Sequence, residues 1–406
     1  MSHFTVMVIT PPGAPDDAVD KALAPFHQFE CTGCDDEYVQ DIDETVDSQK
    51  EYAEKTRKVI LCPDGTKVDT YDDAAMKRFY RPATSVEVAA IKARDGGAPS
   101  EWRSSRGVKG AEAYEVRELP EGYTEVEVPI AEIMSFAAWA EDWYGREPLL
   151  VGQKPDLEDK HKYGYAEVNE AGDVVRIVRR TNKNAKWDWY QVGGRWSGFF
   201  ALKPGASGEK GQPSLLSSAR HREEIESSGR VDSALKGDID FAAKRAEAET
   251  NAALRWDKVR EIVGMDATWK PWKEFIADVD AKALTIEEAR VAYREQPAKL
   301  AMDEALRAEH TATAGEDPTP LRDMFGYFVE LDEYLAPRDV YIRRQGNAAG
   351  KTFAVLHEGK WMERGKMGWW ATVSNEMDEE VWDQQIEDLL TSLPDDARLT
   401  IIDAHI

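Results

Sequence analysis

The stretch AKWDWYQVGGRWSGFF, residues 185–200, constrains the fold more than any other part of the sequence. Three tryptophans, one tyrosine and two phenylalanines lie within sixteen residues, and rings at this density have to be buried against other parts of a folded chain. The two adjacent glycines favour a turn between two strands. Alternation along a strand separates these side chains onto two faces: Trp187 and Trp189 on one, Asp188 and Tyr190 on the other. The sequence therefore predicts a β-hairpin, with one face in the core and the other forming the wall of a pocket.

Basic residues are concentrated around this hairpin. Between residues 176 and 203 there are seven bases and a single acid, in a chain whose formal net charge is −25. Arginine binds phosphate through paired hydrogen bonds, an indole stacks on a flat ring, and glycine lets backbone N–H groups approach an anion. We therefore expect a site for a phosphorylated, ring-bearing ligand such as a nucleotide. The predicted ligand-binding residues are Arg179, Arg180, Lys186, Trp187, Trp189, Tyr190, Gly193, Gly194, Arg195 and Trp196.

The composition indicates a folded protein of about two or three domains, because its 406 residues exceed the roughly 250 that one core commonly supports. A hydrophobic fraction of 42% and thirteen tryptophans exclude a disordered chain. Three cysteines are too few for a disulfide framework, so we expect a reducing cytoplasm. No run approaches the roughly 18 apolar residues of a membrane span, and the start MSHFTVMVITPPG lacks the basic segment of a signal peptide. We expect no membrane partner.

The hydrophobic pattern predicts an α+β fold, with mixed sheets in the N-terminal and middle part and in the C-terminal part, and a mainly helical insertion between them. The helical insertion is rich in Ala, Glu, Lys and Arg, and it contains a capping box at Thr285 and Glu288. The C-terminal part ends in a strand, a helix and a strand, which we interpret as a βαβ unit. The predicted boundaries are 1–202 for the first α+β domain, 203–214 for a flexible linker or loop, 215–312 for the helical region and 313–406 for the C-terminal part.

Three polar residues near the ends of the chain form a candidate for a catalytic site. Asp403 and His405 are two residues apart and share one face of the terminal strand, and His3 begins the first strand. If these strands are neighbours, their side chains converge in a way that suits general acid–base catalysis. A structural role is the alternative. The sequence contains no HExxH, GxSxG or GxGxxG motif that would indicate another kind of active site.

Cys31 and Cys34 form a CxxC motif, with His27 one turn earlier and Cys62 farther along the chain. Three thiolates and an imidazole could hold zinc in a tetrahedral site. Structural zinc sites usually contain a second paired motif, and this sequence has none. We therefore interpret the cysteines as ordinary small residues and predict no cofactor, with zinc at this group as the alternative.

Several segments carry a resemblance to a known group of proteins. They are KWDWYQVGGRWSGFF, PFHQFECTG with DDEYVQDID, HKYGYA, GKMGWW and LPDDARLTIIDAHI. In them the chain resembles a family of uncharacterised proteins encoded by tailed bacteriophages, over most of residues 2–406 and more weakly in the helical middle. The family has no established activity, so the resemblance implies no catalytic residue. It implies a protein made in the cytoplasm of an infected bacterium, where accessory phage proteins often counter host defence.

Three functions are compatible with these features. The first is binding, without catalysis, of a phosphorylated ring-bearing ligand such as a nucleotide or a nucleotide-derived host signal. The second is an acidic protein that imitates DNA and blocks a host nucleic-acid enzyme, as the net charge of −25 allows. The third is a hydrolase or transferase that uses His3, Asp403 and His405. We prefer the first, with a nucleotide-like small molecule or a host protein as partner, and the acidic charge argues against direct binding of nucleic acid.

Overall fold

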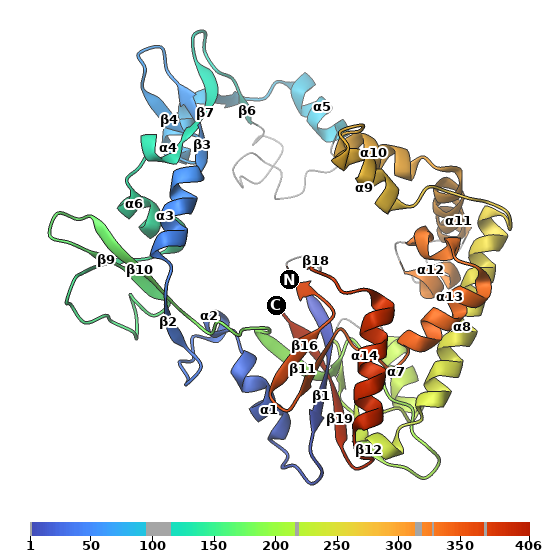
Figure 1. The fold of residues 1–406 in the computed structure, drawn as a ribbon. Coiled ribbons are helices and arrows are strands. Elements are labelled where there is room, and N and C mark those ends of the chain that lie inside the picture. The colour runs from blue at the N-terminus through green and yellow to red at the C-terminus, as the bar shows by residue number, and fades with distance from the viewer. Residues whose placement is uncertain (1, 95–114, 216–218, 313–318, 327–328, 369–371) are drawn as a thin grey trace. The chain divides into compact units, whose positions relative to one another are not determined.

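We describe the protein from a computed structural model that covers residues 2–94, 115–215, 219–312, 319–326, 329–368 and 372–406 (Figure 1). Helices make up 41% and strands 24% of the chain, with several mixed sheets, so the predicted α+β fold is confirmed. The chain divides into two compact units. Unit 1 comprises Met1–His27 and Asn184–Ile406, and unit 2 comprises Gln28–Lys183.

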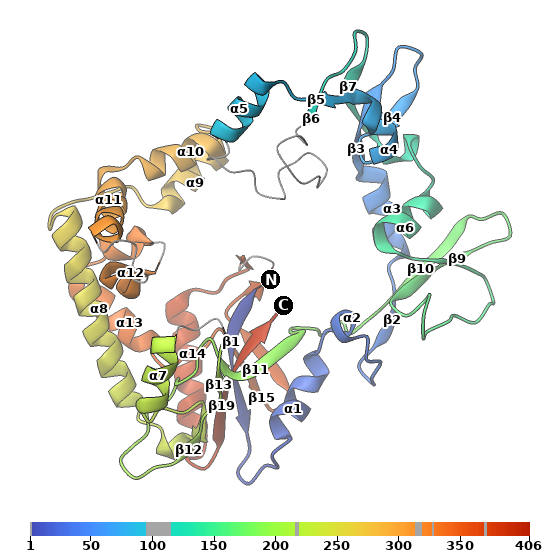
Figure 2. The same ribbon diagram turned by 180° about the vertical axis from the view of Figure 1, so that it is seen from behind.

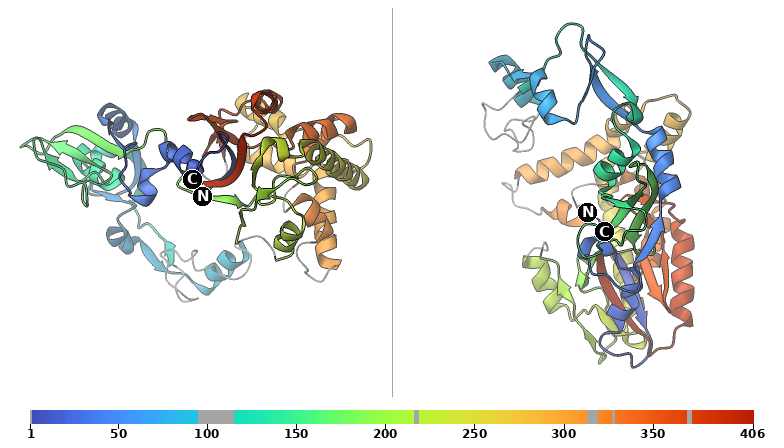
Figure 3. Two further views of the ribbon diagram at one scale, coloured as in Figure 1. Left: turned by 90° about the horizontal axis from the view of Figure 1, so that it is seen from below. Right: turned by 90° about the vertical axis from the view of Figure 1, so that its left-hand side faces the viewer.

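Unit 1 contains a sheet in the order β12-β14-β19-β1-β15-β16, to which β11 and β13 are joined at β19. The central strand β1 (His3–Thr10) pairs antiparallel with β19 (Arg398–His405) and parallel with β15 (Ala354–His357). The remaining strands are β11 (Trp189–Gly194), β12 (Gly208–Glu209), β13 (Gln212–Pro213), β14 (Ser233–Leu235) and β16 (Lys360–Glu363). The strands at the two ends of the chain therefore lie side by side, as all the ribbon views show (Figures 1, 2 and 3).

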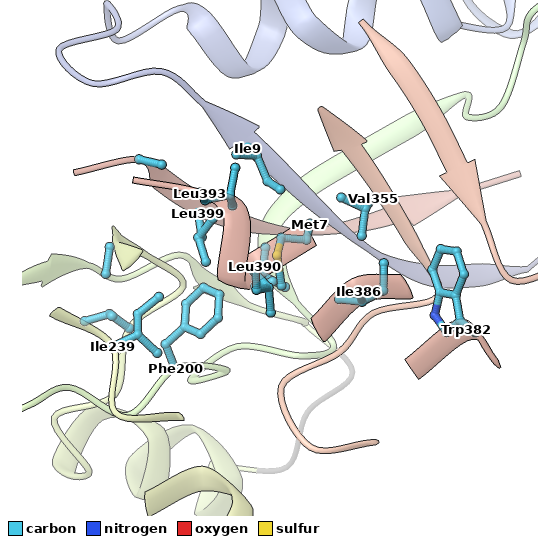
Figure 4. Close-up of a cluster of buried hydrophobic side chains, with 14 residues drawn as sticks. Met7, Ile9, Phe200, Ile239, Val355, Trp382, Ile386, Leu390, Leu393 and Leu399 are labelled. Atoms are coloured by element: carbon cyan, nitrogen blue, oxygen red, sulfur yellow. The ribbon is translucent and has the colours of Figure 1, made fainter. Parts of the chain in front are cut away.

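The two faces of this sheet have separate cores, because successive side chains on a strand point to opposite sides. One face packs beneath helix α14 (Glu379–Ser392), and Figure 4 shows Met7, Ile9, Leu399, Trp382, Ile386 and Leu390 of this core. Ile401 belongs to the same cluster. The other face is covered by α1 (Ala18–Leu23) and the turn after it, and its cluster contains Phe4, Val6, Val8, Leu23, Phe26, Ile402 and Ala404. By the same alternation, His3 and Thr5 share the face of Met7, so that face becomes polar toward the start of β1.

The helices of unit 1 carry a core of their own. Its buried members include Trp256, Val259, Met302 and Tyr341. The predicted capping box at Thr285 is confirmed, and Pro297 is the first residue of a new helix, where its missing N–H costs nothing. The helices are α7 (Ala219–Ser227), α8 (Phe241–Val263), α9 (Trp272–Asp280), α10 (Ile286–Arg294), α11 (Pro297–Ala312), α12 (Pro320–Phe325) and α13 (Arg338–Ala348).

Unit 2 contains smaller sheets in the orders β2-β10-β9-β8, β4-β3-β7 and β5-β6. The segment after Tyr163 forms the antiparallel pair β9 and β10. The strands are β2 (Gln40–Asp43), β3 (Thr56–Leu61), β4 (Lys67–Asp69), β5 (Tyr80–Pro82), β6 (Glu115–Arg117), β7 (Thr124–Pro129), β8 (Pro148–Leu150), β9 (Gly164–Val168) and β10 (Val174–Thr181). The helices are α2 (Phe29–Thr32), α3 (Thr45–Glu54), α4 (Asp73–Met76), α5 (Ser85–Arg94) and α6 (Phe136–Tyr144).

The division of the chain differs from the boundaries that the sequence suggests. The beginning of the chain belongs with residues 184–406, and residues 28–183 form a unit between them. The segment 203–214 is not a linker between domains, because it contains β12 and β13 of unit 1. A Cβ atom on Gly211 would lie 2.6 Å from the Val192 carbonyl carbon. This glycine therefore allows two backbones to approach closely, a role that composition alone does not separate from flexibility.

Two predicted strand arrangements are wrong. Gly193 and Gly194 do not form the turn of a hairpin, because β11 pairs instead with the distant β19 and, in parallel, with β13. The C-terminal strand, helix and strand are not a βαβ unit either. The strand before α14 is β18 (Val373–Ser374), which pairs with β17 (Lys366–Met367) in a separate sheet. Both errors arise because a local pattern identifies a strand but not its partner, which for β11 is the C-terminal strand β19.

Candidate functional site

His3 and His405 meet at the polar end of the central sheet. They are directly opposite each other in the register of β1 and β19, and their ring centroids are 4.9 Å apart. Asp403 lies two residues before His405 on the same face. The sequence predicts that these three side chains converge if the first and last strands are neighbours, and in the structure they are. We call His3, His405, Asp403 and Asp188 the histidine cluster.

Each imidazole of the histidine cluster has its own carboxylate. His3 Nδ1 lies 2.7 Å from Asp403 Oδ1, and His405 Nδ1 lies 2.6 Å from Asp188 Oδ1. An ionised carboxylate only accepts hydrogen bonds, so Nδ1 of each ring is the donor and Nε2 is left for another partner. The His3 and His405 side chains are 18% and 14% exposed, which leaves them within reach of a small molecule. Two oriented imidazoles of this kind can accept one proton and donate another.

The backbone after β11 holds Asp403 in place. Asp403 is 1% exposed, and its Oδ2 accepts a hydrogen bond of 3.0 Å from the Arg195 backbone N–H. The residue before Arg195 has to be a glycine for the backbone to come this close to Asp403. Gly194 has a φ of +56°, and a Cβ there would lie 2.8 Å from Asp403 Cγ. The glycine pair thus does bring a backbone N–H to an anion, as expected, but the anion is a side chain of the protein itself.

A second buried aspartate, Asp232, organises the same loop. Its carboxylate accepts hydrogen bonds from the backbone N–H groups of Gly198, Phe199 and Gly211, at 2.7, 3.1 and 2.9 Å. Burial nevertheless raises the pKa of Asp232 above its usual value. A Cβ on Gly193 would lie 2.7 Å from Asp232 Oδ2. The segment that carries Arg195 is therefore fixed by two carboxylates, one against each glycine of the pair.

Lys244 packs against this loop and makes stability depend on pH. Its Nζ donates to the Phe199 carbonyl and lies 3.9 Å from the Phe199 ring centroid. Burial, with a smaller effect of Arg230, lowers the Lys244 pKa from 10.5 to about 8. Between these values the folded chain binds fewer protons than the unfolded chain, so this group makes stability rise as pH increases from about 8 to 10.5.

We expect the difference in unfolding free energy between wild type and Lys244→Met to shift in favour of wild type by about 1–2 kcal/mol between about pH 7 and pH 9.5. The Met side chain keeps most of the volume but cannot titrate, so the difference isolates the lysine from other groups. Denaturant unfolding at the two pH values measures it. A difference that stays constant with pH would contradict the lowered pKa.

Trp189 forms one side of the histidine cluster. It is opposite His405 in the register of β11 and β19, its ring centroid is 6.2 Å from that of His3, and it is 48% exposed. Trp187 and Tyr190 instead pack together with the core on the other face, with ring centroids 5.1 Å apart. The prediction that Trp187 and Trp189 share one face of a strand is wrong. β11 begins only at Trp189, so the alternation of side chains does not extend back to Trp187.

The other predicted ligand-binding residues are divided between the two units. Arg179 and Arg180 belong to unit 2, where Arg179 pairs with Glu30 and Glu44 and Arg180 pairs with Asp35 and Asp41. In unit 1, Lys186 Nζ lies 2.7 Å from Glu363, and Trp196 packs against the core beneath α14. Arg195 is exposed. Carboxylates of the protein therefore already contact three of the four cations that the sequence assigns to phosphate.

The candidate zinc ligands are also divided between the two units. Cys31 and Cys34 are exposed in unit 2, and Cys62 is buried there in another cluster, where Arg78 Nη2 contacts its sulfur at 3.4 Å. His27 belongs to unit 1 and lies against Trp187. Within the residues that the structure describes, no group of three or more His, Cys, Asp or Glu side chains is arranged to hold a metal ion.

Comparisons with known proteins give no further guide to the site. A scan against protein-family models, a search of the curated proteins and a search of the solved structures found no match to this chain. Among the described residues, no helix has the length and apolar character needed to cross a membrane. The histidine cluster is therefore interpreted from its own chemistry.

Proposed function

We propose that the histidine cluster hydrolyses a phosphodiester bond in a small nucleotide by acid–base catalysis. The observation that carries this proposal is the pair of imidazoles, His3 and His405, side by side and each oriented at Nδ1 by a separate carboxylate. A single His–Asp pair often has only a structural role. Two pairs on adjacent strands supply both a proton acceptor and a proton donor at one place.

The reaction needs both groups at once. The Nε2 of one neutral imidazole takes a proton from water while the water oxygen attacks phosphorus. The bond from phosphorus to the leaving oxygen breaks, and that oxygen receives a proton from Nε2 of the other, protonated imidazole. The products are a phosphate monoester and an alcohol, and proton exchange with water restores the two rings. Histidine suits both roles near neutral pH because its ordinary pKa is close to the working pH.

The surroundings of the cluster support a nucleotide as the substrate. Trp189 presents an exposed indole beside His3, on which a base can stack, and the Arg195 side chain is exposed next to the backbone that holds Asp403. The net charge of −25 repels a long polyanion, which favours a small nucleotide over a nucleic-acid strand. Destruction of a nucleotide-derived host signal would fit the role in countering host defence that the phage resemblance implies.

The proposal is tested by incubating the purified protein with 2′,3′-cyclic and 3′,5′-cyclic mononucleotides, a cyclic dinucleotide and a 5′-nucleotide. We expect hydrolysis of at least one diester, little of the 5′-monoester, and turnover that survives EDTA, since the imidazoles transfer the protons themselves. Chromatography of the products measures this. No hydrolysis of any diester, or complete loss of turnover with EDTA and its recovery with added metal, would contradict the proposed mechanism.

Trp189→Ala separates substrate binding from proton transfer. We expect KM for the hydrolysed diester to rise by about 5- to 100-fold, because stacking of a base on an indole contributes about 1–3 kcal/mol, while kcat changes much less. Trp143→Ala is the matched control, since Trp143 is 49% exposed in unit 2. Steady-state kinetics of both variants measure the split. An unchanged KM in Trp189→Ala would remove the indole from the site.

A further inference from the structure

A cavity in the helical part of unit 1 is lined by residues other than those of the histidine cluster. Its volume is about 740 Å³, which falls inside the range of roughly 300–1,000 Å³ that is common for ligand sites. Its lining comes from α9, α10, α11 and α12 and from the segment 329–332. The charged side chains in the lining are Arg290, Arg294, Lys299, Arg307, Arg322, Asp303, Glu330 and Asp332. We call it the arginine cavity.

Positive charge exceeds negative charge around this cavity. Arg290, Arg294 and Arg307 line it, and none of them makes an ion pair with a residue in the described part of the chain. Arg290 and Arg294 are four residues apart on α10, where like charges repel each other across one turn. Arg338, by contrast, has a carboxylate partner in Asp257, with its Nε 2.7 Å from Oδ1. Three guanidinium groups around one cavity, none with a carboxylate partner among the described residues, indicate an anionic ligand.

One of the acids in the lining already has partners. Asp332 accepts a hydrogen bond of 2.6 Å from the Trp272 backbone N–H and one of 3.1 Å from the Tyr293 hydroxyl. Burial and the nearby carboxylate raise the pKa of Tyr293, so it remains a donor. Asp332 therefore positions two aromatic residues whose ring centroids are 5.4 Å apart, both of which line the cavity. Flat apolar surface and positive charge thus occur together.

We propose that the arginine cavity binds a multiply charged organic anion that carries a flat ring, of the chemical class of nucleoside polyphosphates. Arg290, Arg294 and Arg307 contact the phosphates, and Trp272 and Tyr293 form the apolar wall for the ring. The described lining contains no histidine, and the proposal concerns binding alone. It goes beyond the proposed function and stands or fails independently of it.

Calorimetric titration of the full chain with ATP, inorganic triphosphate and adenosine tests the proposal. We expect ATP to bind saturably, triphosphate more weakly, and adenosine weakest. Arg294→Gln and Arg307→Gln should each weaken ATP binding by at least about tenfold, because each removes a charge-assisted hydrogen bond to phosphate. Both arginines are exposed, so their replacement leaves the helical core intact.

Lys273→Gln is the matched control, because Lys273 is an exposed cation next to Trp272 that does not belong to the described lining of the cavity. ATP affinity in this variant should stay within about twofold of wild type, since an exposed charge that makes no contact is largely screened by salt. Thermal unfolding of each variant verifies that it is folded. The proposal is overturned if ATP and triphosphate both fail to bind wild type, or if Lys273→Gln weakens binding as much as the cavity variants.

Discussion

His405→Asn and His3→Asn are each expected to reduce diester turnover by about 100- to 10,000-fold, the range that a positioned general acid or base contributes. Asparagine keeps an N–H where the Nδ1 donor was, so the hydrogen bonds to Asp188 and Asp403 can persist. It has no group at Nε2 that could transfer a proton. The loss should therefore appear in kcat, with substrate affinity and folding largely retained.

His357→Asn provides the control for this experiment. His357 lies on β15 in the same sheet, opposite Ile9 and thus at the other end of β1 from His3. Its replacement should leave kcat within about twofold of wild type, because a partly exposed residue outside the cluster contributes little. If turnover survives in both His3→Asn and His405→Asn, the histidine cluster is not the catalytic site, whatever the protein hydrolyses.

The acid–base assignment also predicts a pattern of non-additivity. The two imidazoles act on one reaction, so the double variant of His3 and His405 should lose little more activity than the more damaged single variant. Independent roles, such as binding for one ring and catalysis for the other, would instead give losses that multiply. Steady-state rates of the two single variants and the double variant distinguish these cases, with unfolding curves as the measure of structural damage.

The elements of this site could be predicted from the sequence, but its assembly could not. Alternation in the first and last strands places Asp403 and His405 on one face and suggests that His3 joins them if the strands are neighbours. Nothing in a single sequence states that they are. The pairing of β1 with β19 buries both faces of the two strands. Met7 and Ile401 are buried on one face, and Val6 and Ile402 on the other.

Asp188 shows where pattern reasoning misleads. In the sequence it is only the one acid among many bases, yet in the structure it orients His405. Its role depends on β11 pairing with β19, a contact between residues more than two hundred positions apart. The concentration of arginines and tryptophans is a real feature of the sequence, but Arg179 and Arg180 belong to unit 2, and Trp187 packs in the core. Local composition cannot distinguish a cation that awaits a ligand from one paired with a distant carboxylate.

Gly194→Ala should lower both stability and turnover, although it adds a single methyl group to a residue outside the histidine cluster. The backbone of Gly194 has a φ of +56°, which costs an alanine about 1 kcal/mol. The new Cβ would also collide with the Asp403 side chain, 2.8 Å from its Cγ, where burial prevents easy movement. Overpacking of this kind costs about 1–3 kcal/mol more. We expect a total loss of about 2–4 kcal/mol in unfolding free energy.

Gly205→Ala separates the two contributions. Gly205 has a φ of +81° in the same unit, and a Cβ there would meet nothing within 4 Å. It should therefore lose only the backbone part, about 1 kcal/mol, and retain full turnover. Denaturant unfolding and diester hydrolysis of both variants provide the comparison. If the two substitutions destabilise the protein equally, Asp403 moves aside for the Cβ at residue 194 without cost, and the predicted collision does not occur.

The position of the collision decides what happens to activity. Asp403 is held by the Arg195 N–H on one side and holds His3 on the other, so a shift that accommodates a Cβ on Gly194 disturbs the contact between the carboxylate and His3 Nδ1. The imidazole then loses the acceptor that sets its orientation, and kcat should fall by at least about tenfold in molecules that remain folded. A Gly194→Ala variant that is destabilised but fully active would show that the Asp403–His3 contact serves the fold alone.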